Sequence, residues 1–343
     1  MDNGTPSGLL SRSPEEGARL LALAYLDQAA AARLRLEDPS DTEALHDFRV
    51  GLRRLRSCLR SYRRYLEGSI PGKLAKRLRR LASSTGPGRD TEVQIEWLRG
   101  RSRHLSSQHR TGLAWLLARL EERMREAYED LGDRIPQEFP ELEEKLRHRL
   151  SIYRAEIHLG ALSHRVTFGE ATAEILRDQI AELTGHLARV DDAEDQEEAH
   201  EARISAKRLR YLIEPLVADL PAAAPLVKRF KALQDLLGDL HDAHVLEIEL
   251  GEAVEEAAAE RARKLLEITL SDAPDETLLR AERRRSREAG LLTLARLNRA
   301  RRNRLFETLD AEWLEGRAGP FLEEVEALGR VMGRDEESGG VCA

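Results

Sequence analysis

Apolar residues recur along most of this chain at alternating steps of three and four residues, and two-residue alternation is nearly absent. The first spacing is that of one face of an amphipathic helix, whereas the second is that of a strand. Prolines stand mainly between the periodic segments, where helices commonly end. The pattern predicts helices over residues 15–37, 41–67, 72–84, 90–105, 110–131, 141–160, 168–190, 197–218, 223–237, 242–270, 276–316 and 320–332. We expect disordered ends at residues 1–13 and 333–343.

Two glycine-containing segments, LASSTGPGRDTEV and LQDLLGDLHDAHV, are expected to be turns between helices. Gly86 or Gly238 can end a helix in the left-handed conformation, and Asp90 or Asp242 can cap the helix that follows. The segment TGPGRD lacks the Gly-Lys-Ser/Thr ending of a P-loop, so nucleotide hydrolysis gains little support. The pattern leaves open whether residues 242–316 form one bent helix or several.

An internal repeat divides the chain. The segment LHDFRVGLRRLR, which begins at Leu45, matches AHEARISAKRLRY, which begins at Ala199. Further matches follow downstream, where the two turn segments also correspond. A repeat of this length indicates two copies of one helical unit. We therefore predict an all-α fold with two pseudo-symmetric, antiparallel helical-bundle halves, over residues 14–160 and 161–332.

Each copy of the repeated motif carries an apolar seam with a cationic stripe beside it. On a helix the first seam consists of Leu45, Phe48, Leu52, Leu55, Leu59, Tyr62 and Leu66, and the stripe of His46, Arg49, Arg53, Arg56, Arg60 and Arg63. The second stripe consists of His200, Arg203, Lys207 and Arg210. A solvated helix face usually mixes charges of both signs, whereas the first stripe contains no acid. We interpret the stripes as a site for an anionic ligand, with a solvated charged face as the alternative.

The charge of the chain is strongly segregated, although its net value is −7. Residues 46–89 contain 13 Lys and Arg but two acids, and residues 283–304 contain nine Arg and one acid. Residues 191–201 contain seven acids and neither Lys nor Arg, which favours a linker or a surface. A second basic helix follows the first stripe, with Lys73, Lys76, Arg77, Arg79 and Arg80, matched in part by Lys228, Arg229 and Lys231. Such helices around one axis would form a basic cavity for an extended polyphosphorylated chain.

The sequence gives weaker support to a metal site, a disulfide scaffold or a membrane segment. His241 and His244 are spaced as possible metal ligands, but the spacing identifies no third ligand, so we predict neither a metal nor a cofactor. His46 and His200 can either donate to phosphate when protonated or pack at a helix start. The two cysteines, Cys58 and Cys342, exclude a disulfide scaffold. No segment resembles a secretory signal or a membrane span, so we expect a cytoplasmic protein.

The paired motifs, together with the G-x-x-x-D turns, resemble the CHAD domain (conserved histidine α-helical domain) over about residues 12–330. The resemblance implies two pseudo-symmetric helical halves and binding of inorganic polyphosphate in a basic central cavity. It assigns the binding role to His46, Arg49, Arg53, Arg54, Arg56, His200, Arg203, Lys207, Arg208 and Arg210, with support from Lys76, Arg79, Lys228 and Lys231. The stripe and the second basic helix add Arg60, Lys73 and Arg80. Family members are often fused to a triphosphate-tunnel enzyme domain, but no segment here has its paired Glu-x-Glu motifs, so we predict no catalysis.

We therefore predict non-catalytic binding of inorganic polyphosphate, with targeting to polyphosphate granules and polyphosphate-metabolising proteins as possible partners. The first alternative is a nucleic-acid binder, which the lack of aromatic residues within the basic stripes disfavours. The second is a metal-dependent phosphohydrolase, which would need clustered carboxylates near acid-poor helices.

Overall fold

The computed structural model describes residues 6–38, 40–41, 43–152, 166–271, 275–284 and 287–333. All regular structure in these ranges is helical, so the predicted all-α class is confirmed. The α-helices are α1 (Pro14–Arg35), α2 (Ala44–Ser61), α3 (Gly72–Ser84), α4 (Gly86–Arg101), α5 (Arg110–Ser151), α6 (Phe168–Leu187), α7 (Gln196–Ile213), α8 (Ala223–Thr269), α9 (Glu276–Arg284), α10 (Arg287–Trp313) and α11 (Gly319–Met332). Short 3₁₀ turns follow α2, α4 and α7.

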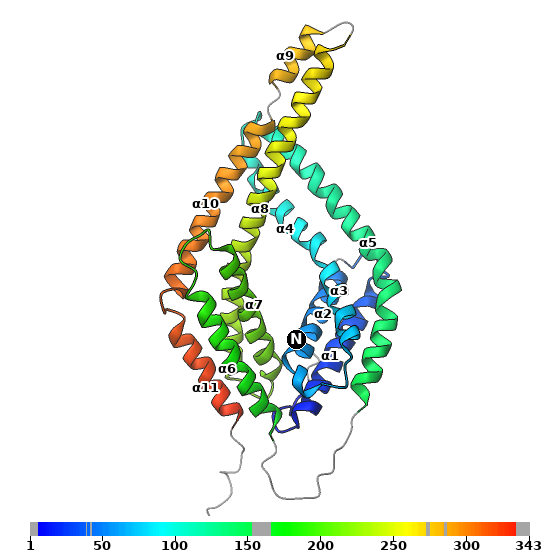
Figure 1. Ribbon diagram of the computed structural model, residues 1–343, viewed down its shortest axis with the longest axis vertical. Coiled ribbons are helices and arrows are strands. Elements are labelled where there is room, and N and C mark those ends of the chain that lie inside the picture. Colours follow the sequence, from blue (N-terminus) through cyan, green and yellow to red (C-terminus); the bar gives the residue numbers. More distant parts are fainter. Residues whose placement is uncertain are drawn as a thin grey trace, which may run out of the picture.

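The helices form two groups that meet at one end of an elongated molecule (Figure 1). Helices α1, α2 and α3 pack against each other and the second half of α5, and α6, α7, α8 and α11 form the opposite group. Helix α2 contacts α7, so the helices that carry the two copies of the repeated motif lie next to each other. Helices α4, α5, α8 and α10 converge at the far end, from which the end of α8 projects with α9.

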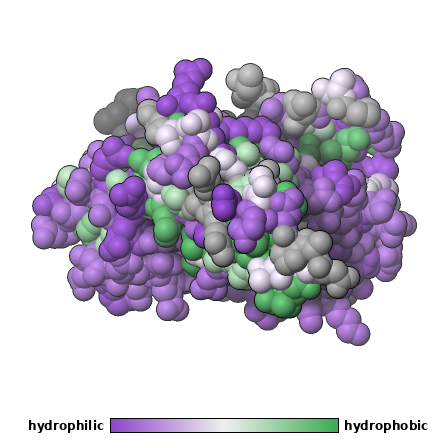
Figure 2. All heavy atoms as spheres, turned by 90° about the horizontal axis from the view of Figure 1, so that it is seen from above, coloured by the Kyte–Doolittle hydropathy of each residue, from purple (hydrophilic) through white to green (hydrophobic). Residues whose placement is uncertain are grey.

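Two apolar clusters hold this arrangement together. The larger, the base cluster, contains buried residues from both helix groups, including the stretches Leu131–Leu150 of α5 and Ala223–Leu240 of α8. The smaller, the upper cluster, joins α4, the first turns of α5, the stretch Leu246–Ala257 of α8, and α10. The long helices α5 and α8 therefore belong to both clusters. The surface seen from above is mainly hydrophilic (Figure 2).

Helix α5 contradicts the predicted break between residues 131 and 141. It continues through Pro136 and Pro140, both of which are exposed. A proline inside a helix removes a hydrogen bond and costs about 3 kcal/mol. Leu131, Ile135 and Phe139 nevertheless continue one buried seam past the prolines, so packing outweighs this local penalty.

The two turn predictions have different outcomes. The break in the first segment is confirmed, because α3 ends at Ser84 and α4 begins at Gly86, but Gly86 has no positive φ and does not end α3 in the left-handed conformation. The predicted turn at Gly238 is wrong, because α8 runs through it. Asp90 and Asp242 consequently lie inside helices and do not cap them. Two separate helices, α9 and α10, occupy the range predicted as one helix over residues 276–316.

The N-terminal residues are ordered further than predicted. The backbone N–H groups of Gly8 and Leu9 donate to the Asp219 carboxylate at 2.8 and 2.9 Å. The Leu9 side chain is fully buried, and the carbonyl of Leu10 accepts a 3.0 Å hydrogen bond from Gly169. The prediction of disorder is therefore wrong for residues 6–13, whereas residues 1–5 and 334–343 lie outside the described ranges, as do residues 153–160 of the predicted helix.

The acidic run at residues 191–201 is tied into the fold and is not a free linker. Arg302 on α10 is almost fully buried and pairs with Glu194 of the run and with Glu247 of α8, at 3.0 and 2.7 Å. Asp195 accepts from the backbone N–H groups of Asp191 and Asp192. Within the basic segment at residues 283–304, Arg287 and Arg301 also pair with acids, namely Glu260 and Asp239. In the described part of the chain, no helix is long and apolar enough to cross a membrane.

Candidate anion-binding site

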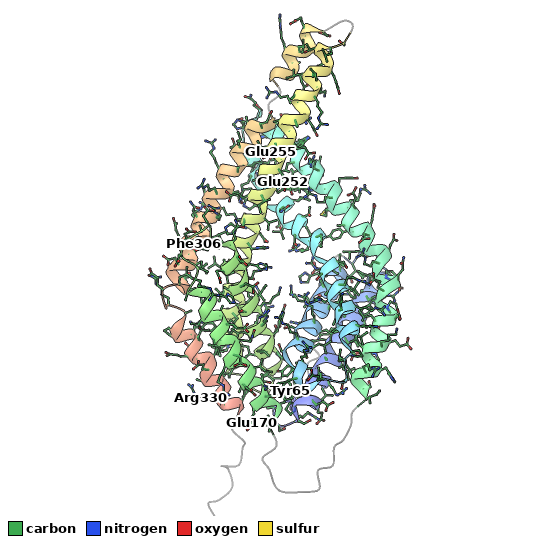
Figure 3. All side chains as sticks on the ribbon, in the orientation of Figure 1. Tyr65, Glu170, Glu252, Glu255, Phe306 and Arg330 are labelled. Atoms are coloured by element: carbon green, nitrogen blue, oxygen red, sulfur yellow. The ribbon has the colours of Figure 1, made fainter. Side chains whose placement is uncertain are left out.

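The cationic stripes of α2 and α7 flank the contact between these two helices. The apolar seam of α2 is buried, and Phe48 packs edge-on against Phe139 of α5 with ring centroids 5.0 Å apart. Because that seam faces the core, the stripe beside it lies at the edge of the buried interface. Arg49, Arg53 and Arg56 are partly buried, and so are Arg203, Lys207 and Arg210 on α7. Side chains from both helices project toward the space between them (Figure 3).

Tyr211 marks the place where the two rows meet. Its ring is buried on α7, and the guanidinium carbon of Arg53, on α2, lies 5.7 Å from the ring centroid. Arg210 approaches the same ring at 5.0 Å. A guanidinium group at this distance from an aromatic ring makes a cation–π contact. The aromatic residue absent from the cationic stripes is thus supplied by the last residue of the second motif.

Lys207 shows how closely the cations are assembled. Burial, and then the positive charges of Arg53, Arg203, Arg56 and Arg210, together lower the pKa of Lys207 to about 7. Burial also lowers the pKa of Arg56, again with cationic neighbours, Arg53 and Arg60, as the next causes. Two helices therefore contribute like charges to one partly buried region.

These cations lack close ion pairs. Within the described ranges, no ion pair within 4.0 Å involves Arg49, Arg53, Arg56, Arg203 or Lys207. Asp90 acts on Arg49, Arg203 and Lys207 from a greater distance. The Nε of Arg53 is buried and has no hydrogen-bond partner. Buried polar groups are usually hydrogen-bonded, and an unpaired buried charge is strongly destabilising. The arrangement therefore leaves room for an anion as the missing partner.

Two carboxylates, which the sequence suggested only as caps, lie at the edge of the cationic site. Burial raises the pKa of Asp90, against the opposing effect of Arg49, Arg203 and Lys207, although the side chain is exposed to water. Burial also raises the pKa of Asp242, with Arg203 opposing and Asp90 adding to the rise. The equivalent position of the two aspartates in the repeat was the signal in the sequence that could have placed them together.

Arg203 is the cation that links the two carboxylates. A Cβ atom at Gly238 of α8 would lie 4.0 Å from the Arg203 Nε, so the guanidinium group of α7 lies against α8 at this glycine. Asp242 follows one turn later on the same helix. Asp242 stands on α8 between Leu240 of the base cluster and Leu246 of the upper cluster.

A pair of histidine rings adjoins Arg203. The ring centroids of His200 and His241 are 4.8 Å apart, and the Nδ1 of His200 is buried without a partner. Burial, and then Arg203, lowers the pKa of His241 to about 4, and burial lowers that of His200 as well. Both rings are therefore neutral near pH 7, which favours packing over the charged phosphate-donor role for His200.

The remaining two histidines play other parts. The Nε2 of His244 donates to the carbonyl oxygen of Ala193 at 2.7 Å, which fixes its proton on that nitrogen. His46 is exposed in the first turn of α2. Among the described residues, no three His, Cys, Asp or Glu side chains form a group that could hold a metal ion.

Several residues predicted for the site are instead engaged with acids. Arg54 pairs with Glu214, which Arg210 also approaches at 3.5 Å. Arg208 pairs with Glu182 of α6 at 3.0 Å, and Arg80 with Glu138 of α5 at 3.2 Å. Lys231 pairs with Asp235 on its own helix at 2.8 Å. The structure therefore separates these cations from the unpaired group.

The other predicted cations are exposed. Arg60 and Arg79 both act on the pKa of Arg56, which places them next to the unpaired group. Arg60 also lines a pocket with Arg208 and Glu182, at the end of the row. Lys73, Lys76 and Lys228 are exposed and have no ion-pair partner in the described part of the chain.

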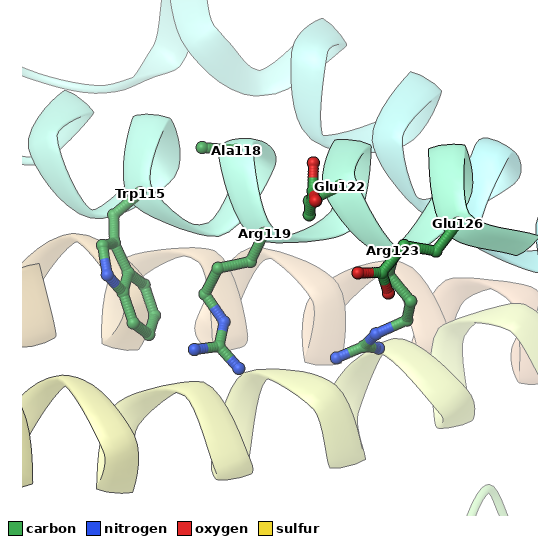
Figure 4. Close-up of a pocket in the computed structure, with 6 residues that line it drawn as sticks. All are labelled: Trp115, Ala118, Arg119, Glu122, Arg123 and Glu126. Carbon is green, nitrogen blue, oxygen red and sulfur yellow. The ribbon is translucent and has the colours of Figure 1, made fainter.

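A separate pocket lies on α5, where Trp115, Arg119, Glu122, Arg123 and Glu126 line it (Figure 4). Arg119 stacks at 4.8 Å from the Trp115 ring and pairs with Glu256, and Arg123 pairs with Glu249 at 2.7 Å. Because acids on α8 neutralise its cations, this pocket lacks the unpaired charge of the site between α2 and α7.

The profile of the CHAD domain family matches residues 21–251, about two thirds of the chain. The chain therefore belongs to the CHAD domain family. Its fold is similar to the crystal structure of the CHAD domain from the plant Ricinus communis, with a TM-score of 0.57 and 17% sequence identity. The similarity covers 95% of this chain and 94% of that one. No curated protein sequence matches the chain.

Proposed function

We propose that this protein binds inorganic polyphosphate in the cationic site between α2 and α7, and that it does so without catalysis. The observation that carries the proposal is the group of five cations, Arg49, Arg53, Arg56, Arg203 and Lys207, without ion-pair partners. Membership of the CHAD domain family supports it, because that family is associated with polyphosphate binding. A cytoplasmic location, association with polyphosphate granules and contact with polyphosphate-metabolising proteins belong to the same proposal.

The charges themselves favour a polyanion. Like charges held together in a partly desolvated region raise the free energy of the empty protein. Phosphate oxygens can accept from several guanidinium groups at once, and each such charge-assisted bond is about twice as strong as a neutral one. A chain with regularly repeated negative charges can satisfy both rows, whereas one small anion satisfies only part of them.

Polyphosphate fits the site better than nucleic acid does. A single-stranded nucleic acid gains affinity when its bases stack on accessible aromatic rings. Tyr211 lies between the rows, but its ring is buried and already engaged by Arg53 and Arg210. If single-stranded RNA of equal total charge displaces polyphosphate at equal concentration, the nucleic-acid alternative is favoured instead.

The phosphohydrolase alternative rests on Asp90 and Asp242, the carboxylates nearest the unpaired cations. Magnesium is held by several oxygen ligands, whereas among the described residues no three His, Cys, Asp or Glu side chains form a group that could hold a metal ion. We therefore expect no release of phosphate from long-chain polyphosphate when Mg²⁺ or Mn²⁺ is added. Metal-dependent release that is lost in the Asp90→Asn variant would contradict the non-catalytic assignment.

The decisive experiment compares two double variants, each of which replaces one arginine and one lysine with glutamine. Arg53→Gln with Lys207→Gln removes one cation from each row, and Arg263→Gln with Lys264→Gln removes two exposed cations near the far end of α8. Because a hydrogen bond to a charged group contributes about 1.5–3 kcal/mol, we expect the first pair to lower polyphosphate affinity at least about a hundredfold. The second pair should change affinity less than about threefold.

Binding is measured by isothermal calorimetry, and helix content by circular dichroism confirms that each variant folds. Equal affinities for the two folded double variants would refute the assignment of the site.

A further inference from the structure

Lys207 differs from every other lysine of the chain in its surroundings. It is partly buried, whereas the others are exposed, namely Lys73, Lys76, Lys145, Lys228, Lys231 and Lys264. It has no ion-pair or hydrogen-bond partner in the described part of the chain. Lys207 is therefore less accessible to water than the exposed lysines, but it is not fully buried.

Arginines surround this amine on two helices. Arg203 lies four residues before it and Arg210 three residues after it, so both share its face of α7. From α2, Arg53 reaches Tyr211, one turn beyond Lys207, and Arg53 and Arg56 both act on the charge of Lys207. A small anion that enters the site therefore meets several guanidinium groups around one amine.

The same surroundings make the amine a nucleophile. With a pKa of about 7, about half of the Lys207 amines carry no proton near neutral pH. An exposed lysine of ordinary pKa has fewer than about one unprotonated amine in a thousand at that pH. Only the unprotonated amine has the free electron pair that attacks an electrophile.

We propose that Lys207 is a modification site for small acyl phosphates, which the arginines bind through the phosphate group. The Lys207 nitrogen attacks the carbonyl carbon and forms the C–N bond. The bond from that carbon to the phosphate oxygen breaks, and inorganic phosphate leaves with the electron pair. The surplus proton of the nitrogen passes to the departing phosphate or to water. The products are an amide at Lys207 and free phosphate.

Acylation removes one positive charge from the centre of the two rows. The modified protein therefore binds polyanions more weakly, and a bound polyanion shields the amine. This inference uses the same cationic site as the proposed function, but the modification itself does not require polyphosphate to be the ligand.

The test exposes the full chain to acetyl phosphate at pH 7.5 and follows acetylation of each lysine by mass spectrometry. Lys264 and Lys73 serve as exposed references within the same molecule. We expect Lys207 to react at least about tenfold faster than either, because far more of its amine is unprotonated. Acetic anhydride, which carries no phosphate, should show a smaller preference for Lys207.

Two variants separate the contribution of the Arg203 guanidinium group from that of the Lys207 amine. In Arg203→Gln, the loss of a guanidinium group should reduce the rate at Lys207 at least about threefold and leave Lys264 unchanged. In Lys207→Arg, the label at this position should disappear, whereas Lys264 and Lys73 should react at their wild-type rates. Equal rates at Lys207 and Lys264 in the folded chain would overturn the proposal.

The experiment also distinguishes failure of the modification proposal from failure of the proposed polyphosphate binding. Selective labelling of Lys207 that added polyphosphate does not slow supports the modification site and counts against polyphosphate as the ligand. Tight polyphosphate binding without selective labelling supports the ligand and overturns the modification site.

Discussion

At the scale of single residues, adjacent arginines in one motif have opposite roles. Arg53 and Arg54 are neighbours in the sequence, yet Arg53 points to α7 and has no ion pair, whereas Arg54 pairs with Glu214. A helix turns by about 100° per residue, so neighbours necessarily face different surroundings. The sequence could not separate the two, because Glu214 lies 160 residues further along the chain.

This difference predicts opposite effects for two matched substitutions. Arg54→Gln should lower the free energy of unfolding by about 1–3 kcal/mol, because it leaves Glu214 partly buried with a weaker partner. It should change polyphosphate affinity little. Arg53→Gln should weaken polyphosphate binding at least about tenfold without loss of stability. Urea unfolding and calorimetry on both variants check the prediction, and identical profiles for the two would contradict it.

The lowered pKa of Lys207 predicts a pH-dependent stability of the ligand-free protein. The folded state loses this proton near pH 7, whereas the unfolded state keeps it until about pH 10.5, so the unfolded state binds more protons between these values. Stability contributed by this group therefore rises with pH across that window. Relative to wild type, Lys207→Met should be most stabilising below pH 7, and its advantage should shrink by pH 9.

Urea unfolding at pH 6 and pH 9 measures this difference, with Lys264→Met as the exposed control. The control should show no such change with pH. An advantage of Lys207→Met that is the same at both values would show that the folded protein does not depress the pKa.

At the scale of the helices, periodicity predicted most elements and failed where packing overrules a local rule. Proline and glycine were expected to end helices, yet α5 continues through Pro136 and Pro140, and α8 through Gly238. Seam residues on both sides of these positions are buried in one cluster, and no local signal reports that distant contact. The positions of the cationic side chains on α2 and α7 were predictable, because they follow from helical spacing alone.

The crossing of α5 and α10 offers a prediction at this scale. A Cβ atom at Gly112 would lie 2.3 Å from the carbonyl oxygen of Arg287, and one at Gly290 would lie 2.2 Å from that of His109. The two backbones therefore approach each other too closely for any side chain. Gly112→Ala should destabilise the protein by about 1–3 kcal/mol through overpacking, although alanine favours helices.

Gly132 provides the matched control on the same helix, because a Cβ atom there meets nothing within 4 Å. Gly132→Ala should stabilise the protein by about 0.5–1 kcal/mol through helix propensity alone. Thermal unfolding of both variants decides the matter, and stabilisation in both cases would mean that α5 and α10 do not meet as described.

At the scale of the whole molecule, the sequence predicted an all-α chain and a candidate site of positive charge. It did not predict that Asp90 and Asp242 would approach the same arginine, Arg203, or that Arg208 and Arg80 would be neutralised. Those outcomes depend on contacts between helices far apart in the sequence. The internal repeat and the division into two halves stay predictions, since both apolar clusters contain residues from each half.

The charge of the whole molecule predicts how polyphosphate affinity should depend on salt concentration. The net charge of −7 opposes long-range attraction, so affinity has to come from the local cations. Each phosphate contact releases counterions, so the logarithm of the binding constant should fall linearly with the logarithm of salt concentration. Arg53→Gln with Lys207→Gln should reduce that slope by about two, and the control pair near the end of α8 should leave it unchanged. Titrations at four salt concentrations measure the slopes.

Helices α5 and α8 each pass through both apolar clusters, and this continuity has a mechanical consequence. Any hinge between the base and the far end of the molecule would have to break two long helices at once. Bending between the two clusters is therefore costly, and we expect the base and the far end of the molecule to move as one rigid unit.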